Sequence, residues 1–269
     1  MSDITLINDS EQSSLVTNGL AKNGELYLKK AGSTDAGSIV VYDSGVWKTF
    51  ANEGGAFANT YSVNFDGTDD SANTTLGSQI FNSDYGLSLW IKPTRAGNNT
   101  ILVHLGSSSS YNDGFRLYQQ SSGFNFWSGL GGYSNVFGTT GSVTLNAWQN
   151  IIVTRSGSSM AFYLNGSSVG TGTNSSAYTN TDFVINYAQY TMFQGLMDEV
   201  SLFTSALSSS DATAIYNSGV AGDLSSLSPA AWWRMGDSDS GSGSTITDEV
   251  ASADLTLVNG PTFSTDVPS

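Results

Sequence analysis

Short runs in which apolar and polar residues alternate recur along most of the chain, separated by turns rich in Gly, Ser and Asn. Such runs are typical of β-strands with one buried face, and their regular spacing predicts a two-sheet antiparallel sandwich. The clearest predicted strands lie at 86–92, 100–105, 115–118, 124–127, 148–155 and 160–164. A strong turn signal, Asn165-Gly166, follows the last of them.

A separate leader precedes this body. Within it, 39–42 and 46–50 are apolar and flank the turn residues 43–45, which predicts a β-hairpin with two apolar faces. Residues 1–52 are too few to bury a core of their own. We therefore predict that they form an attachment or self-association element, which binds another protein or joins copies of the chain into a homo-oligomer such as a trimer. The alternative is an ordinary hairpin that packs wholly on its own body.

One short helix is predicted after the last strand of the body. Ser208 can cap its first turn, and Asp211, three residues later, completes a capping box. Gly219 is expected to provide the left-handed residue that ends the helix.

Five segments, in this order, resemble motifs of laminin G-like domains in the concanavalin A-like lectin/glucanase superfamily. They are 61–70 with its Phe-Asp-Gly, 87–93, 148–155, 161–166, and 193–203 with its Asp-Glu-Val. The resemblance covers roughly residues 60–218 and implies an all-β, antiparallel jelly-roll sandwich within a domain at 53–269. It also implies a module that binds carbohydrates or protein partners.

The tail, 223–269, resembles the strands that usually precede the Phe-Asp-Gly strand in this family. Here it follows the helix, so it is either a circular permutation that supplies those strands or the start of a second, truncated module. We expect the permutation, because exposed Trp232, Trp233 and Phe263 on a lone hairpin would promote aggregation. Modules with this tail and leader also resemble predicted virion proteins of marine bacteriophages.

The composition limits the binding partners, the origin and the cellular location that we expect for the protein. The net charge of −14 argues against nucleic acid, since few cations are present to neutralise phosphates. Cysteine is absent, which in a domain of this size is more typical of bacterial or viral proteins than of secreted eukaryotic ones. Neither a membrane-spanning stretch nor a signal-peptide pattern is seen, so we expect no membrane partner and a protein made in the host cytoplasm.

No motif predicts catalysis. Glycosidases of this fold need two carboxylates across a cleft, often as Glu-x-Asp-x-x-Glu, and no such run occurs. Asp198 and Glu199 are adjacent, so on a regular strand they would point to opposite faces. The only histidine, His104, lies in an apolar run and is expected on a sheet surface. We predict that the protein is not an enzyme.

The family resemblance implies a structural calcium ion between the Phe-Asp-Gly turn and the Asp-Glu-Val strand. Its ligands would be the Asp198 side chain and the Asp66-Gly67 region, with help from Asp69 or Asp70. Calcium accepts such mixed sets of carboxylate and carbonyl oxygens. The alternative is that Asp66 only sets its turn and Asp198 only accepts hydrogen bonds from backbone amides.

Sugar binding would require aromatic rings and amide or carboxylate groups at the sandwich surface, because rings cover apolar sugar faces and polar groups bind hydroxyls. The candidates are Tyr111, Asn112, Asp113, Trp127, Tyr133 and Asn135. In the strand 124–127, alternation places Phe124 and Phe126 on one face and Trp127 on the other. The Phe pair is expected to face inward, which leaves Trp127 outward unless a bulge follows Phe126.

These inferences predict a non-enzymatic bacteriophage virion component, displayed on a head, neck or tail. Its leader would hold it to other virion proteins, and its lectin-like module would bind host glycans or neighbouring proteins. The alternative is a bacterial surface or secreted carbohydrate-binding module, and a third reading is a glycoside hydrolase of the same fold.

Overall fold

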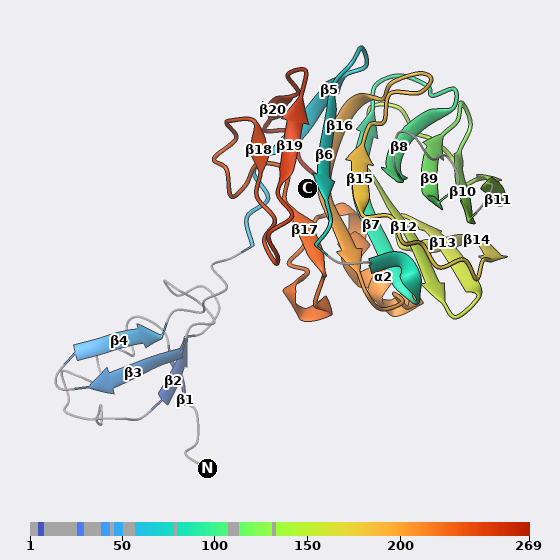
Figure 1. Cartoon of the computed structure of the whole chain (residues 1–269). Coiled ribbons are helices and arrows are strands. Elements are labelled where there is room, and N and C mark those ends of the chain that lie inside the picture. The colour runs from blue at the N-terminus through green and yellow to red at the C-terminus, as the bar shows by residue number, and fades with distance from the viewer. Residues whose placement is uncertain are drawn as a thin grey trace. The chain divides into compact units, whose positions relative to one another are not determined.

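The structure is a computed structural model of the chain, and it has two compact units, residues 1–58 and 59–269 (Figure 1). It describes 57–77, 80–106, 113–130 and 133–269, together with the four leader strands, whose backbone alone is described. The side chains of 113, 130 and 133–135 also lie outside the description. Within the described residues, no helix is long and apolar enough to cross a membrane.

The first unit contains a four-stranded sheet in the order β1-β2-β3-β4. Its strands are β1 (Thr5–Ile7), β2 (Leu26–Lys29), β3 (Ile39–Asp43) and β4 (Val46–Phe50). β3 and β4 are antiparallel, with Ile39 opposite Phe50 and Asp43 opposite Val46. This pairing confirms the predicted hairpin.

The second unit is a sandwich of two antiparallel eight-stranded sheets, as predicted (Figure 1). We name them after their central strands. The β8 sheet has the order β11-β10-β9-β8-β15-β6-β19-β18, and the β7 sheet has the order β14-β13-β12-β7-β16-β5-β20, with β17 paired to β16.

Each of the six strands predicted from alternation corresponds to a strand of the sandwich, with bounds that differ by at most three residues at either end. In the β8 sheet the strands are β6 (Ser71–Thr75), β8 (Thr100–Leu105), β9 (Asp113–Gln119), β10 (Phe124–Leu130), β11 (Tyr133–Thr140), β15 (Asp182–Ile185), β18 (Thr245–Ile246) and β19 (Leu255–Val258). In the β7 sheet they are β5 (Ser62–Asp66), β7 (Tyr85–Pro93), β12 (Gln149–Ser156), β13 (Ser159–Leu164), β14 (Ser167–Thr173), β16 (Gln194–Phe203), β17 (Ala231–Trp233) and β20 (Thr262–Ser264). Three short 3-10 turns complete the unit: η1 (Ile80–Asn82), η2 (Asn217–Gly219) and η3 (Ser225–Leu227).

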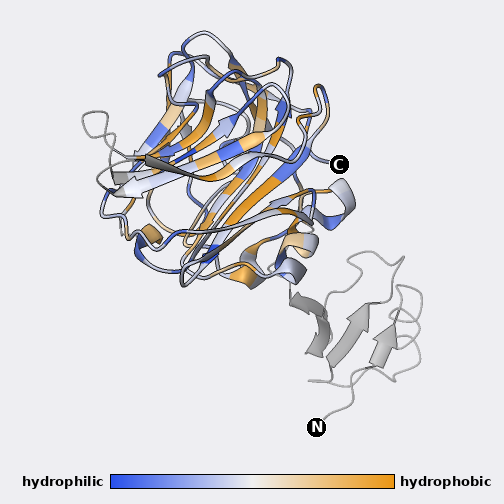
Figure 2. Ribbon diagram, turned by 90° about the vertical axis from the view of Figure 1, so that its right-hand side faces the viewer, coloured by the Kyte–Doolittle hydropathy of each residue, from blue (hydrophilic) through white to orange (hydrophobic). Residues whose placement is uncertain are grey.

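The hydrophobic core lies between the sheets, because each strand turns its apolar alternate residues inward. Figure 2 shows these hydrophobic residues along the strands of the sandwich. Phe115 is central, with ring centroids 4.8 Å from Phe81 and 5.2 Å from Phe126. Phe124 and Phe126 are both fully buried in the core, which confirms that this pair faces inward.

The tail completes both sheets. β17 and β20 extend the β7 sheet through β16 and β5, while β19 pairs with β6 of the β8 sheet. Trp233 is fully buried, and its ring stacks on Phe183 with centroids 5.3 Å apart. Trp232 is 7% exposed. The burial of both indoles confirms that the tail docks onto the body.

The one α-helix of the described residues, α2 (Ser209–Tyr216), packs on the outside of the β7 sheet, where Tyr216 stacks on Trp90 at 5.8 Å. The Ser208 side chain accepts a hydrogen bond from the Asp211 amide, and Asp211 accepts one from the Ser208 amide, which confirms the capping box. The helix ends earlier than predicted. Asn217, not Gly219, is the left-handed cap, with φ 42°, because asparagine is one of the few residues that tolerate this conformation.

Candidate functional site

A row of side chains crosses the outer face of the β8 sheet, perpendicular to the strands. Its members are directly paired on six neighbouring strands: Trp127, Arg116, His104, Val184, Asn73 and Thr256. Their chain neighbours, such as Phe126 and Leu117, point into the core, so the row must point outward. Five strand spacings separate Trp127 from Thr256, a distance of about 24 Å.

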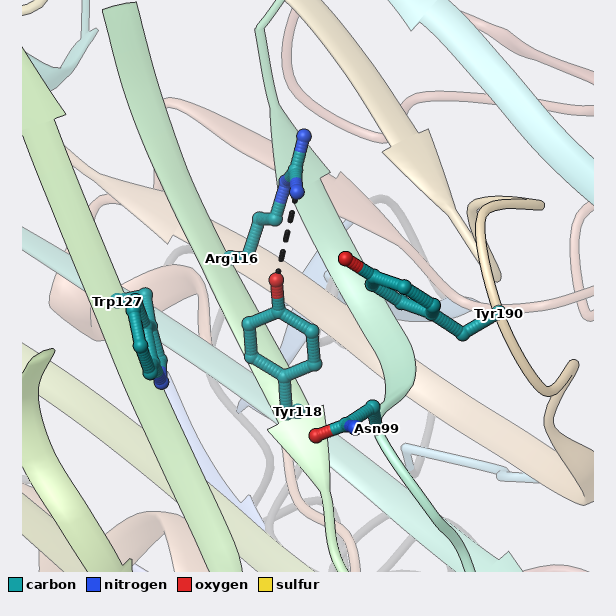
Figure 3. Close-up of a pocket in the computed structure, with 5 residues that line it drawn as sticks. All are labelled: Asn99, Arg116, Tyr118, Trp127 and Tyr190. Carbon is teal, nitrogen blue, oxygen red and sulfur yellow. Dashed lines mark hydrogen bonds between the residues drawn. The ribbon is translucent and has the colours of Figure 1, made fainter. Parts of the chain in front are cut away.

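A cleft of 370 Å³ lies at the Trp127 end of this row (Figure 3). It is lined by Asn99, Arg116, Tyr118, Trp127 and Tyr190. Figure 3 shows Tyr118 between Trp127 on one side and Tyr190 on the other. The Tyr118 and Trp127 rings meet edge to face with centroids 6.4 Å apart, and Tyr190 is 59% exposed.

Hydrogen bonds fix the polar groups of this first cleft. Arg116 donates through Nη1 to the Tyr118 hydroxyl at 3.4 Å and to the Gln189 side-chain oxygen at 2.5 Å. Asn99 is held in a left-handed turn, with φ 57°, by two hydrogen bonds with the side chain of Gln120. The cleft thus presents aromatic rings beside a guanidinium and an amide. This combination can cover a flat apolar surface and bind hydroxyl or carboxylate groups at its edge.

A second cleft, of 410 Å³, lies on the same sheet face toward the other end of the row. It is lined by Asn73, Thr74, Thr75, Gly106, Asp182, Val184, Tyr187, Asp254 and Thr256. Most of these residues carry hydroxyl, amide or carboxylate groups, so this cleft offers hydrogen-bond donors and acceptors rather than stacking surfaces.

His104 lies in the middle of the row, beneath Tyr187. The two rings are tilted against each other with centroids 4.3 Å apart, and His104 is fully buried. Burial, together with the positive charge of Arg116, lowers the pKa of His104 to about 3, so the imidazole is neutral at physiological pH. The expected position on a sheet surface is confirmed, but Tyr187 covers it.

Of the predicted sugar-binding residues, Trp127 lines the first cleft. Tyr111 and Asn112 lie outside the described residues, as do the side chains of Asp113, Tyr133 and Asn135. The backbone places Asn135 on β11 directly opposite Trp127. A role in sugar binding stays a prediction for all six.

Four other residues of the first cleft were not predicted. Arg116 and Tyr118 lie two positions apart on β9 and alternate with the core residues Phe115 and Leu117. Alternation in the predicted strand therefore carried the signal for both. Asn99 and Tyr190 come from loops that are distant in sequence, and only the fold brings them together.

The strand register does not bring the predicted calcium ligands together. Asp66 pairs with Gln194 at one end of the β5–β16 contact, and Asp198 lies four residues further along β16, a separation of about 13 Å. A single ion cannot contact both, so the shared site predicted from Asp198 and Asp66-Gly67 is wrong.

Both aspartates instead show the alternative roles. Asp66 accepts a hydrogen bond from the Thr68 amide at 2.7 Å and so sets its turn, and Asp198 accepts one from the Glu199 amide at 2.8 Å. Carboxylate oxygens of Asp66, Asp69 and Asp70 lie within 4.8 Å of one another. Calcium binding by this group stays a prediction.

A bulge interrupts β16 at Asp198 and Glu199, so the alternation expected of a regular strand does not apply there. Both residues are buried, and burial raises the pKa of Asp198 well above its usual value and that of Glu199 to about 8. Glu199 accepts hydrogen bonds from the Trp232 indole at 2.5 Å and from Arg234 at 3.3 Å. Glu199 therefore anchors the tail strand β17, and neither carboxyl group lines either cleft.

Comparison with known proteins gives a family match. The family model for the concanavalin A-like lectin/glucanases superfamily matches residues 66–213, which is more than half of the chain. No curated protein sequence matches significantly.

Solved structures give matches of low sequence identity. A protein of Bacteroides ovatus for which carbohydrate binding has been proposed is 18% identical, with a TM-score of 0.60 over 92% of this chain and 71% of that one. Domain 4 of the Geobacillus stearothermophilus arabinanase AbnA, in complex with arabinotriose, is 17% identical, with a TM-score of 0.45 over 75% of this chain and 95% of that one. At these identities the first match supports the fold alone, and the second is too distant to support an argument.

Proposed function

The chain belongs to the concanavalin A-like lectin/glucanases superfamily, and on this premise we propose that residues 59–269 form a non-enzymatic carbohydrate-binding module. The observation that carries the proposal is the first cleft, which is lined by the aromatic rings of Trp127, Tyr118 and Tyr190 together with the polar groups of Arg116 and Asn99. Rings at a sheet surface cover the apolar faces of sugars, and the adjacent polar groups bind sugar hydroxyls.

The first cleft also supports binding over hydrolysis. A glycosidase needs two carboxyl groups on either side of the scissile bond, and none of the residues that line this cleft carries one. The buried pair Asp198 and Glu199 belongs to the other sheet of the sandwich.

Two of the protein classes that the sequence suggests, a bacterial carbohydrate-binding module and a bacteriophage virion protein, are compatible with this proposal. The alternative, a bacterial surface or secreted carbohydrate-binding module, fits the comparisons better, since carbohydrate binding has been proposed for the Bacteroides ovatus protein that shares the fold. A bacteriophage virion protein, held to its particle by the leader, stays a prediction of the sequence. Either protein would use the same cleft.

Affinity gel electrophoresis of the full-length protein would test the proposal against soluble polysaccharides. The panel would contain laminarin, xylan, galactomannan and hydroxyethyl cellulose as neutral chains, and alginate and polygalacturonate as acidic ones. We expect at least one to retard the protein, and we expect Trp127→Ala to weaken that binding by at least about tenfold, or 1.4 kcal/mol.

Trp148→Ala is the matched control. Trp148 is also a half-buried tryptophan, but it binds Asp266 through its indole at 2.9 Å and lines neither cleft. Absence of retardation by any polysaccharide, or an equal effect of the two substitutions, would contradict the assignment. Release of reducing sugar from a bound polysaccharide would contradict the non-enzymatic part.

A further inference from the structure

The two ring nitrogens of His104 have no hydrogen-bond partner, although the side chain is fully buried. A buried polar atom without a partner destabilises the folded protein, because it has lost its hydrogen bonds to water and gained none in exchange. An apolar residue at this position would fold at least as well. The position of His104, in the middle of a row that joins two clefts, offers a functional explanation for this unsatisfied group.

The segment that covers His104 is attached firmly at its base. Asn186 and Phe193 form reciprocal hydrogen bonds, with the Phe193 amide donating to the Asn186 side chain at 2.8 Å and the Asn186 amide group donating back at 3.3 Å. Residues 187–192 therefore form a loop whose two ends are held together next to the sheet. We call residues 187–190 the strap.

The strap contacts the sheet at His104 and Arg116. Tyr187 packs on His104, Gln189 accepts a hydrogen bond from Arg116, and the Arg116 guanidinium lies 5.9 Å from the centre of the Tyr187 ring. A sugar ring could replace each of them, because it has apolar faces that pack on imidazole and hydroxyl groups that accept hydrogen bonds from guanidinium.

The strap also separates the two clefts. Tyr190, at one end, lines the first cleft, and Tyr187, at the other, lines the second. Movement of the strap away from the sheet would expose His104 and Arg116 and join the clefts along the whole row. The joined groove would run about 24 Å across six strands, which is far longer than a single sugar ring.

We propose that the ligand is an extended polysaccharide chain that displaces the strap, occupies both clefts, and satisfies the ring nitrogens of His104 with its hydroxyl groups. The neutral imidazole has one donor and one acceptor nitrogen, so it can bind two hydroxyls at once. This inference rests on the proposed carbohydrate-binding function. It adds the length of the ligand, a contact with His104, and a conformational change.

The test uses His104→Phe, which keeps an aromatic ring under Tyr187 but removes both nitrogens. We expect this variant to melt a few degrees higher than the wild type, since no unsatisfied atom remains in the folded state. We also expect it to bind the polysaccharide that retards the wild-type protein at least tenfold more weakly. A purely structural histidine would not combine a gain in stability with a loss of binding.

Since His104 is the only histidine in the chain, its ring signals in NMR spectra of the untagged protein are unambiguous. They should shift when the retarding polysaccharide from the panel is added. Short oligomers of that polysaccharide that fill only one cleft should bind more weakly than longer ones, and His104→Phe should remove most of this difference.

The possible failures are distinguishable. If Trp127→Ala abolishes binding while the His104 signals stay in place and His104→Phe binds like the wild type, the ligand occupies the first cleft alone and this inference is wrong. If no polysaccharide in the panel binds, the proposed function fails and this inference fails with it.

Discussion

The contribution of the tail to the core can be measured at Trp233. This side chain is fully buried, stacks on Phe183 at 5.3 Å, and donates a hydrogen bond from its indole to the Ala253 carbonyl at 2.8 Å. Replacement by alanine removes the buried ring and leaves a cavity, at a cost of about 3–5 kcal/mol, and it also leaves that carbonyl without a donor. The free energy of unfolding of a domain is only about 5–15 kcal/mol, so Trp233→Ala should remove a large part of it.

For a domain of this size, about 2–4 °C of melting temperature corresponds to each kcal/mol, so we expect a fall of roughly 6–20 °C. Circular dichroism during heating of the full-length protein would measure it, and chemical denaturation would give the free energy. Val250→Ala is the control, because Val250 lies in the same tail but is 49% exposed. A loss below about 1 kcal/mol for Trp233→Ala would mean that the tail is not part of the cooperative core.

Two further predictions concern the β16 bulge and the helix. The pKa of Glu199 is raised to about 8, from 4.5 in the unfolded chain, so the folded state binds more protons between these pH values. The free energy of unfolding should therefore fall as pH rises from 4.5 to 8. Glu199→Gln should flatten this dependence in denaturation curves measured across that range. A pH profile unchanged by the substitution would show that another group holds the proton. Ser208→Ala should cost about 1 kcal/mol by removing the cap of α2. Ser209→Ala, at an exposed serine that begins the same helix and takes no part in the capping box, should cost much less in the same assay.

Most of the sandwich was predictable because its strands alternate regularly. β8 was expected at 100–105 and runs over Thr100–Leu105, and β7 and β12 differ from their expected bounds by one residue at each end. The exact end of α2 was not predictable, since both Asn217 and Gly219 can adopt left-handed conformations. Nothing in the local sequence decides which of these two residues ends the helix.

The candidate site was less predictable, for two physical reasons. Trp127 was found because its strand alternates, whereas Tyr190 and Asn99 reach the cleft from loops whose positions depend on the whole fold. The predicted sharing of one ion by Asp198 and the Asp66-Gly67 turn failed because it assumed that two motifs pair at their ends, whereas the register places Asp198 beyond Met197 and Val63, well away from Asp66. A register is set by packing along the entire strand, which a motif of three residues does not specify.

Under the proposed function, the tail would couple stability to ligand binding. β19 pairs with β6, so its alternate residues Leu255 and Leu257 enter the core while Thr256 faces the second cleft. Asp254, one residue before β19, also lines that cleft. The same short segment therefore buries apolar side chains for the fold and presents polar ones to the groove. A deletion of the tail would remove part of the binding surface together with part of the core, so point substitutions at Thr256 and Asp254, which leave Leu255 and Leu257 in place, are the way to separate the two roles.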